Sequence, residues 1–263
     1  MKPLGIILAI LSLGAAAYAQ PSVASGGVLN GASFTLNQPV APGSYVSIFG
    51  SSLAATAAAA SSVPLSTSLG GVSVKFNDIE APLNYVSPTQ INAQLPYGLA
   101  GSTSAQVVVT TGAGSSSPQI VNITDLAPGI FSLGNGQAVA YGNQDFTFAA
   151  APGSIPGLTT HAAKINDPQT LVILATGLGA VDPPIADGVG DSTAIHNTVT
   201  KPVVTVGGVN AQVVFSGLLP GFPAVYQVNI VVPTGSPTGN AVPLQIQMGN
   251  ITSTNTTTIA VTN

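Results

Sequence analysis

The residues that could carry chemistry are few. His161 and His196 are the only histidines in the 263-residue chain, and the chain has no cysteine. A catalytic histidine needs an orienting acid and a nucleophile within reach. Asp191 and Ser192 lie shortly before His196, but no Asp-x-x-His follows near the C-terminus and no Gly-x-Ser-x-Gly occurs. We therefore predict no enzyme, and keep a hydrolase with an Asp/Ser/His site as a remote alternative.

Three carboxylates fall in one glycine-rich stretch, as Asp182, Asp187 and Asp191. Oxygen ligands on such a loop could hold calcium. The spacing does not fit the calcium loop of an EF-hand, which places ligands at every second position and a Glu at the twelfth. We interpret the stretch as a structural turn, leave calcium binding open, and predict no cofactor.

An amide motif occurs twice, in TQINAQLPYGLAGST (Thr89–Thr103) and in VYQVNIVVPTGSPTG (Val225–Gly239). The shared positions are Gln90, Asn92, Pro96, Gln227, Asn229 and Pro233. Alternate amides on one strand face could bind sugar hydroxyls, or they could tie a neighbouring loop to the strand. Because both segments share them, we favour the role in supporting the fold.

Aromatic residues offer a second kind of candidate site. The chain has no tryptophan, and most of its Tyr and Phe residues stand at strand positions where core packing explains them. Tyr97, Tyr141 and Phe222 lie in or near expected loops and form a possible contact surface. Phe222 sits in an apolar loop, where it either packs on a neighbouring domain or marks a contact surface.

The charge of the chain excludes one class of partner. Charged residues make up 5% of the chain, and the only cations beyond Lys2 are Lys75, Lys164 and Lys201. Nucleic-acid binding needs Lys and Arg clustered on one face. We therefore predict no nucleic-acid partner.

The first residues read as a secretory signal peptide. Lys2 precedes the apolar run Leu4–Ala17, and Ala17-Tyr18-Ala19 is a small-x-small cleavage site. The pattern predicts cleavage after Ala19 and a secreted protein, extracellular or at the cell surface. No later stretch is apolar and long enough to span a membrane.

Short alternating runs dominate the rest of the chain. Val72–Phe76 places Val72, Val74 and Phe76 on one face, and Gln106–Thr110 and Leu244–Met248 are similar. Short strands between frequent turns indicate an all-β sandwich or barrel. The alanine-rich run Ala54–Ala60 is the only good helix composition, and we expect at most one or two helical turns there.

The segments recur in the same order, which predicts a duplication. GVLNGASFTL from Gly27 returns as AVAYGNQDFTF from Ala138, and GSYVSIFGSSLA from Gly43 returns as PQTLVILATGLG from Pro168. We predict a signal peptide (1–19), a first sandwich (20–125), a connector (126–136) and a second sandwich with long loop insertions (137–263). The insertion at 149–164 is expected to lie over the first domain or the seam between domains.

The segment order also resembles the Ig-like IPT/TIG fold. The carrying residues are Val46-Ile48-Gly50-Leu53, Val74-Phe76-Ala81, Gln90-Ile91-Asn92-Pro96 and Val107-Val109, and the second copy departs at Ala175, where the first has Gly50. The chain from 26 to 263 further resembles a secreted Solibacter-type C-terminal domain family, through APGSYVSIFG, NYVSPTQINAQLP, LAPGIF, ATGLGAVDPPIADG and YQVNIVVP. These resemblances imply two tandem Ig-like domains, export and a bacterial source, and they imply no activity.

The leading hypothesis is therefore a non-catalytic secreted module for interaction or structure. Its partner would be a component of the cell envelope, an extracellular protein or a polysaccharide. The alternative is a carbohydrate-binding module that uses loop aromatics. An exposed cluster around Tyr97, Tyr141 or Phe222 would favour that alternative.

Overall fold

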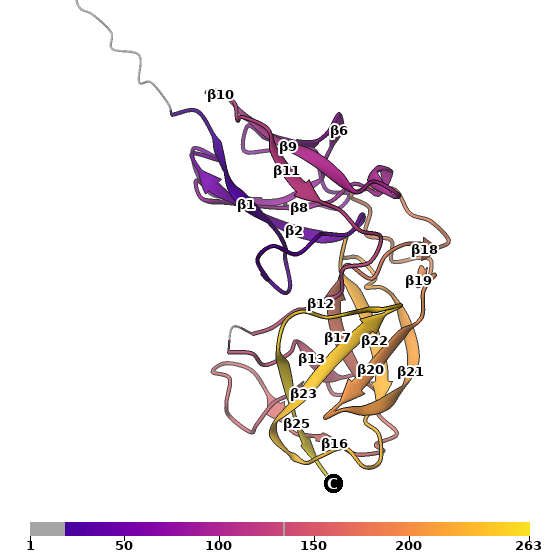
Figure 1. Cartoon of the computed structure of the whole chain (residues 1–263). Coiled ribbons are helices and arrows are strands. Elements are labelled where there is room, and N and C mark those ends of the chain that lie inside the picture. Colours follow the sequence, from indigo (N-terminus) through magenta and orange to yellow (C-terminus); the bar gives the residue numbers. More distant parts are fainter. Residues whose placement is uncertain (1–18, 134) are drawn as a thin grey trace, which may run out of the picture.

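The computed structural model of the chain describes residues 19–133 and 135–263. Residues 1–18, which hold all but the last residue of the predicted signal peptide, lie outside the described residues. The prediction of an all-β protein is confirmed: in the described part, the 3-10 turn η1 (Tyr97–Leu99) is the only helical element. No helix in this part is long and apolar enough to cross a membrane. Two domains stack end to end (Figure 1).

The N-terminal domain has one core that draws residues from Val23 to Ile123. Its first sheet has the order β1-β2-β8-β7-β3. These strands are β1 (Ser22–Asn30), β2 (Tyr45–Ser51), β8 (Gln90–Gln94), β7 (Leu83–Val86) and β3 (Ala58–Ala59). The second sheet has the order β10-β9-β5-β4, with β11 on β9 and β6 on β5. These strands are β10 (Gly114–Ser115), β9 (Ser104–Thr111), β5 (Val72–Phe76), β4 (Ser68–Leu69), β11 (Gln119–Asn122) and β6 (Ile79–Glu80).

The C-terminal domain has a separate core, from Ile130 to Val261. Its strands form one sheet in the order β15-β14-β13-β17-β22-β21-β20-β23-β25-β16. They are β15 (Thr160–His161), β14 (Phe148–Ala149), β13 (Ala140–Gly142), β17 (Leu171–Thr176), β22 (Tyr226–Val231), β21 (Val209–Leu218), β20 (Pro202–Val206), β23 (Gly239–Met248), β25 (Thr257–Thr262) and β16 (Ala163–Lys164). Shorter strands attach at the side: β12 (Gly129–Ile130), β18 (Val181–Asp182), β19 (Asn197–Thr198) and β24 (Ile251–Thr252).

This sheet nearly closes into a barrel. Its two end strands, β15 and β16, are separated in sequence by Ala162 alone. β15 pairs with β14, and β16 pairs with β25 in parallel. The second domain is thus a β-domain with a nearly closed, barrel-like sheet, whereas the sequence predicted an Ig-like sandwich.

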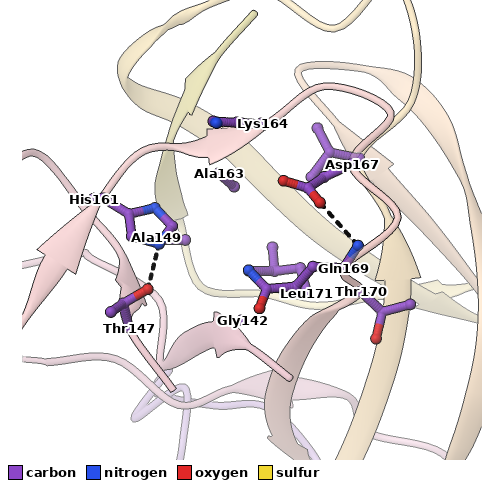
Figure 2. Close-up of a pocket in the computed structure, with 11 residues that line it drawn as sticks. Gly142, Thr147, Ala149, His161, Ala163, Lys164, Asp167, Gln169, Thr170 and Leu171 are labelled. Carbon is purple, nitrogen blue, oxygen red and sulfur yellow. Dashed lines mark hydrogen bonds between the residues drawn. The ribbon is translucent and has the colours of Figure 1, made fainter. Parts of the chain in front are cut away.

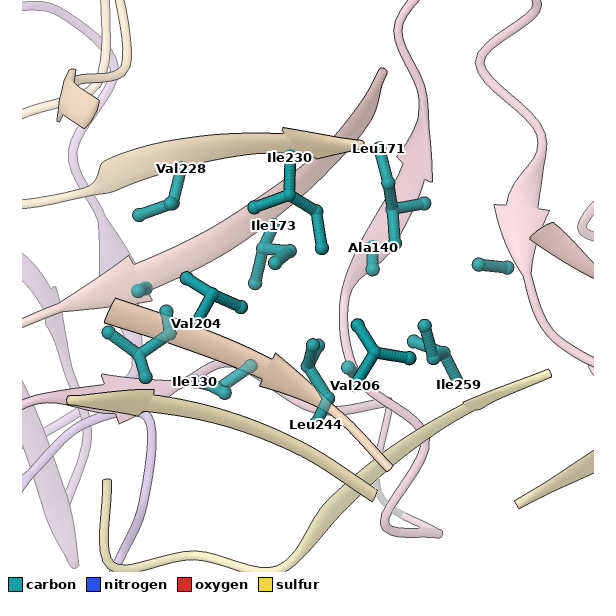
Figure 3. Close-up of a cluster of buried hydrophobic side chains, with 14 of the residues drawn as sticks. Ile130, Ala140, Leu171, Ile173, Val204, Val206, Val228, Ile230, Leu244 and Ile259 are labelled. Atoms are coloured by element: carbon teal, nitrogen blue, oxygen red, sulfur yellow. The ribbon is translucent and has the colours of Figure 1, made fainter. Parts of the chain in front are cut away.

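Alternation explains why these segments are strands. Along β23 the side chains of Val242, Leu244, Ile246 and Met248 are buried, while the residues between them are exposed. Alternate side chains of a strand point to opposite faces, so this pattern buries one face and leaves the other in water. Figure 3 shows the resulting core, where side chains from β17, β20, β22 and β23 meet inside the curled sheet.

Hydrogen bonds join the two domains at a seam. The Gln94 side chain accepts the Gly188 N–H at 2.5 Å. The Tyr45 N–H donates to Thr176 Oγ1 at 2.8 Å, and the Thr176 hydroxyl in turn donates to the Ala224 carbonyl at 2.7 Å. Buried hydrogen-bonding groups need partners. The polar groups at this junction therefore hold the domains in one arrangement.

The alanine-rich run Ala54–Ala60 forms no helical turn, which is within the expected limit of one or two turns, and its Ala58 and Ala59 pair with β7 as β3. Seven residues cannot nucleate a stable helix alone, whereas a strand edge supplies hydrogen bonds at once. The prediction that the 149–164 insertion lies over the first domain or the seam is wrong: the insertion supplies β15 and β16 at the two ends of the C-terminal sheet.

Candidate functional site

The turn between β13 and β14 presents an aromatic ring to solvent. Phe146 is 69% exposed, and its backbone is left-handed, with φ of 55°. Its ring lies 6.1 Å from that of Tyr141, which in turn lies 5.9 Å from that of Phe148. A bulky residue with positive φ is uncommon, and it persists only where its surroundings hold it. We call Tyr141, Phe146 and Phe148 the aromatic turn.

Hydrogen bonds fix the aromatic turn in place. The Phe146 N–H donates to the carbonyl of Gly142, the last residue of β13, at 3.0 Å. The Thr147 N–H donates to Asp145 Oδ1 at 3.1 Å. Gln169 Oε1 accepts the N–H groups of Gln144 and Asp145, at 3.1 and 3.3 Å. The ring of Phe146 is thus held out by a turn whose backbone is bonded on several sides.

A small cavity lies behind this turn (Figure 2). His161, Thr147, Lys164, Asp167 and Gln169 are among the residues that line it. Its volume is about 20 Å³, which is space for one water molecule. The cavity is too small for a substrate.

Both ring nitrogens of the histidine beside this cavity have hydrogen-bond partners. His161 Nε2 lies 2.9 Å from Asp145 Oδ2 and also contacts the Thr147 hydroxyl, while Nδ1 lies 2.9 Å from the Ala162 carbonyl. A catalytic triad needs the acid on one ring nitrogen and the nucleophile on the other. Here acid and hydroxyl converge on the same nitrogen, so the group cannot act as a triad.

Electrostatics agree with a structural role for this pair. The hydrogen bonds that the imidazole makes to the Asp145 carboxylate and to the Ala162 carbonyl raise the pKa of His161. The same imidazole holds the pKa of Asp145 well below its usual range. Acceptors on both nitrogens favour the protonated ring. His161 therefore ties the aromatic turn to β15 through Asp145 and Thr147.

The second histidine is arranged in a similar way. His196 Nε2 lies 3.2 Å from Asp191 Oδ2, and Nδ1 lies 2.6 Å from the Pro183 carbonyl. The Pro183 carbonyl, then the Asp191 carboxylate, raise the pKa of His196. The other oxygen of Asp191 accepts the N–H and hydroxyl of Thr193, both at 2.7 Å. The structure thus brings His196 and Asp191 together as the hydrolase alternative required, but leaves neither ring nitrogen for Ser192.

The three acidic residues of the 182–191 stretch have separate surroundings. Asp187 accepts the N–H of Tyr97 across the seam at 2.9 Å, Asp191 holds His196, and Asp182 is exposed in β18. Among residues 19–133 and 135–263, no three His, Asp or Glu side chains converge to hold a metal ion.

The amide motif has unequal surroundings in the two domains. In the N-terminal domain Gln90 Nε2 donates to Asn92 Oδ1 at 2.8 Å, and the Ser47 hydroxyl donates to the same oxygen at 3.0 Å. These bonds tie β8 to β2. In the C-terminal domain Asn229 Oδ1 is buried without a hydrogen-bond partner among the described residues. Pro96 precedes η1, Gln227 pairs with Leu174, and Pro233 follows β22.

The three loop aromatics named from the sequence lie in different places. Tyr97 packs at the seam, and its hydroxyl is buried. Its ring leaves no room for a side chain at Gly43, where a Cβ would lie 2.0 Å from Cε1. Phe222 is 58% exposed on the loop between β21 and β22. Only Tyr141 belongs to an aromatic cluster with an exposed ring.

Sequence reasoning missed Phe146 and Phe148, because their exposure depends on the turn. The available signal was the repeat itself, in which FTF at 146–148 matches FTL at 34–36. It also missed a groove beside β19, β20 and β21, with a volume of about 680 Å³. Polar and apolar residues line this groove, among them Asn197, Lys201, Asn210, Val203, Val213 and Phe215.

Comparison with known proteins places one domain in a family. Residues 33–122 match the IPT/TIG domain, so the N-terminal domain contains an IPT/TIG domain, as the sequence resemblance implied. No curated protein matches the chain.

Several solved structures match the chain at low identity and low TM-score. SGBP-B from a xyloglucan utilization locus of Bacteroides uniformis matches at 14% identity and a TM-score of 0.25, over 92% of this chain and 49% of that one. SGBP-B of Bacteroides ovatus, in complex with a mixed-linkage heptasaccharide, matches at 13% and 0.33, over 85% and 45%. Domains 5–6 of the S-layer protein SbsC match at 12% and 0.26, over 93% and 99%. This chain spans about half the length of the two SGBP-B chains.

Proposed function

We propose that the protein is a non-catalytic interaction module that works outside the cell or at its surface. The observation that carries this proposal is the aromatic turn. Phe146 is 69% exposed and held in a left-handed conformation by hydrogen bonds around it. An apolar ring fixed in water costs solvation and strain, and such features are concentrated at contact sites.

The two histidine pairs support a binding role over catalysis. Each imidazole has hydrogen-bond acceptors on both ring nitrogens. A general base needs one free nitrogen close to the proton that it removes. Both groups instead fix loops, His161 at the aromatic turn and His196 in the loop before β19.

A polysaccharide is the ligand class that the turn favours. Tyr141, Phe146 and Phe148 provide ring surface, and the neighbouring Asn143 and Gln144 are exposed amides. Rings stack on the apolar faces of sugars, while amides bond to hydroxyls. Asp145 Oδ2 is paired with His161 Nε2 at 2.9 Å, and no lysine lies in the turn, so we favour a neutral glycan over an ionic partner.

The groove beside β19–β21 is a second candidate contact region. Its volume of about 680 Å³ falls in the range of ligand pockets. Phe215 offers a ring, and Asn197, Asn210 and Lys201 offer hydrogen-bond donors. Replacing Phe215 by alanine tests binding at this groove separately from binding at the aromatic turn.

Co-sedimentation with amorphous cellulose, amorphous chitin and purified bacterial envelopes tests the proposal. We expect saturable retention that falls at least tenfold in Phe146→Ala. Phe222→Ala is the matched control, because Phe222 is also an exposed ring but lies at the other end of the sheet, and its retention should not change. Retention lost only in Phe215→Ala would move the site to the groove. Retention on none of the three surfaces would reject the proposal.

A further inference from the structure

A second turn, in the N-terminal domain, has the same construction as the aromatic turn. Phe34 has φ of 51° and is 47% exposed, against 55° and 69% for Phe146. The Phe34 N–H donates to the carbonyl of Asn30 at 3.0 Å. Asn30 is the last residue of β1, as Gly142 is the last residue of β13. Both turns therefore have the same hydrogen bond, from the phenylalanine N–H to the carbonyl four residues earlier, directly after a strand.

The flanking residues also correspond. In each turn the side chain of the residue before the phenylalanine accepts the N–H of the threonine that follows the phenylalanine. The distance is 3.4 Å from Thr35 to Ser33 and 3.1 Å from Thr147 to Asp145. Each phenylalanine packs its ring on one other aromatic ring. The centroid separation is 6.3 Å from Phe34 to Phe49 and 6.1 Å from Phe146 to Tyr141.

The shared geometry places a strained, exposed ring at the same position of both domains. A left-handed aromatic residue is rare enough that core packing gives no reason to build it twice. From this we infer that the Phe34 turn is a second contact site, equivalent to the aromatic turn, and that the protein binds a polymeric neutral glycan at both. This inference rests on the proposed function and extends it from one site to two.

The two sites are spaced along the long axis of the molecule. The Phe34 turn lies at the seam, where Thr254 of the C-terminal domain donates a hydrogen bond to Thr35 at 3.0 Å. In Figure 1 the loop after β1 reaches down towards the C-terminal domain. Gly142, by contrast, pairs with Leu171, the end of β17 away from the seam. β17 has six residues and spans roughly 17 Å, so the two turns lie towards opposite ends of a strand of about this length.

The chemistry of the two turns selects the same ligand. Ser33, Thr35 and Asn37 surround Phe34 with uncharged polar groups. No lysine lies in either turn. A repeating uncharged polymer offers the same ring and hydroxyl surface at regular intervals along its length. It can therefore occupy both sites at once, with an avidity gain of about 10²–10⁴ over either site alone.

Binding to amorphous cellulose and amorphous chitin, with calorimetry on cellotetraose and chitotetraose, tests the inference. Phe34→Ala and Phe146→Ala should each weaken retention on the polymer by about 10²–10⁴-fold, because either change removes the avidity gain. Each should also lower the tetrasaccharide stoichiometry from two per chain to one, and the double variant should lose both. Phe34→Leu keeps an apolar contact with Phe49 while removing the ring, so it gives the same answer if Phe34→Ala folds poorly.

Each outcome decides between readings. If the wild type binds one tetrasaccharide per chain, and Phe34→Ala and Phe34→Leu change neither this stoichiometry nor retention, Phe34 only covers Phe49, and the proposed function stands with a single site. If retention is absent for the wild type, both the inference and its basis fail. If the wild type instead binds neutral phosphatidylcholine vesicles and loses this with either variant, the partner is a lipid surface, and the glycan inference is overturned.

Discussion

The carboxylate of Asp187 in the C-terminal domain accepts the backbone N–H of Tyr97 in the N-terminal domain, with 2.9 Å between Oδ1 and N. Next to it, Gly188 donates its N–H to Gln94 and its carbonyl accepts the N–H of Leu65, at 2.5 and 2.8 Å. One loop thus makes three bonds into the neighbouring domain. Burial raises the pKa of Asp187, and the bond from Tyr97 opposes this.

Removing this carboxylate should loosen the seam. In Asp187→Ala the Tyr97 N–H loses its partner, which should cost about 1–3 kcal/mol. We expect the single calorimetric unfolding transition to broaden or split as the domains unfold separately. Asp182→Ala, which removes an exposed carboxylate from the same stretch, is the control. Equal melting curves for the two variants would show that the seam does not depend on Asp187.

A close approach of backbone at Gly177 should make this position intolerant of any side chain. Gly177 has φ of 76°, and a Cβ there would lie 2.0 Å from the Ala127 carbonyl oxygen. Gly208 has φ of 83° but open space around it. Gly208→Ala should cost only the left-handed conformation, about 1–2 kcal/mol. Gly177→Ala should cost about 1–3 kcal/mol more. Urea denaturation of both variants measures the difference, and equal losses would refute the close approach.

The left-handed backbone at Phe146 predicts that glycine is more stable than alanine at this position. Phe146→Gly should be more stable than Phe146→Ala by about 1 kcal/mol, because only glycine adopts positive φ without strain. At Phe222, where the backbone is not left-handed, the order should reverse. Thermal melts of the four variants check the sign. The same order at both positions would contradict the strained turn.

Stability should fall as the pH rises above neutrality. The pKa values of His161 and His196 are raised in the folded state. Their contribution is therefore complete below the unfolded value of about 6.5 and is lost as the pH rises through the folded values. The Asp145 and Asp191 pKa values are lowered, so their contribution is present above about 3.8 and is lost at acidic pH.

Denaturant unfolding at pH 6 and pH 9 tests this dependence. The groups that face His161 are Asp145, Thr147, the Ala162 carbonyl and the more distant Lys164, whose charge opposes protonation. We expect the wild type to be less stable at pH 9, and the double variant His161→Gln/His196→Gln to show a smaller difference. An unchanged difference in the double variant would assign the pH dependence to other groups.

Strand positions were predictable from the sequence because burial follows alternation. Val72, Val74 and Phe76 lie on the buried face of β5, as their spacing predicted. The order of the strands and the closure of the second sheet were not, since they depend on pairs such as Ala163 with Val261, far apart in sequence.

The candidate site was only partly predictable. Tyr141 was named for its place near a loop, and it does lie in an aromatic cluster. Whether a loop ring points outward depends on the local backbone. Tyr97 packs its ring over Gly43 at the seam, whereas Phe146 is turned into solvent by its left-handed φ. Composition and periodicity carry no information on that choice.

The near-closure of the C-terminal sheet at β15 and β16 limits the strand edge that this domain can expose to other copies of the chain. With charged residues at 5% of the chain, repulsion between molecules is weak. Open strand edges would then invite pairing between copies and precipitation. A curled sheet whose two end strands are consecutive in the chain leaves little edge to share. Near-closure of the backbone thus leaves the C-terminal domain with little unpaired edge at which copies of so weakly charged a chain could pair.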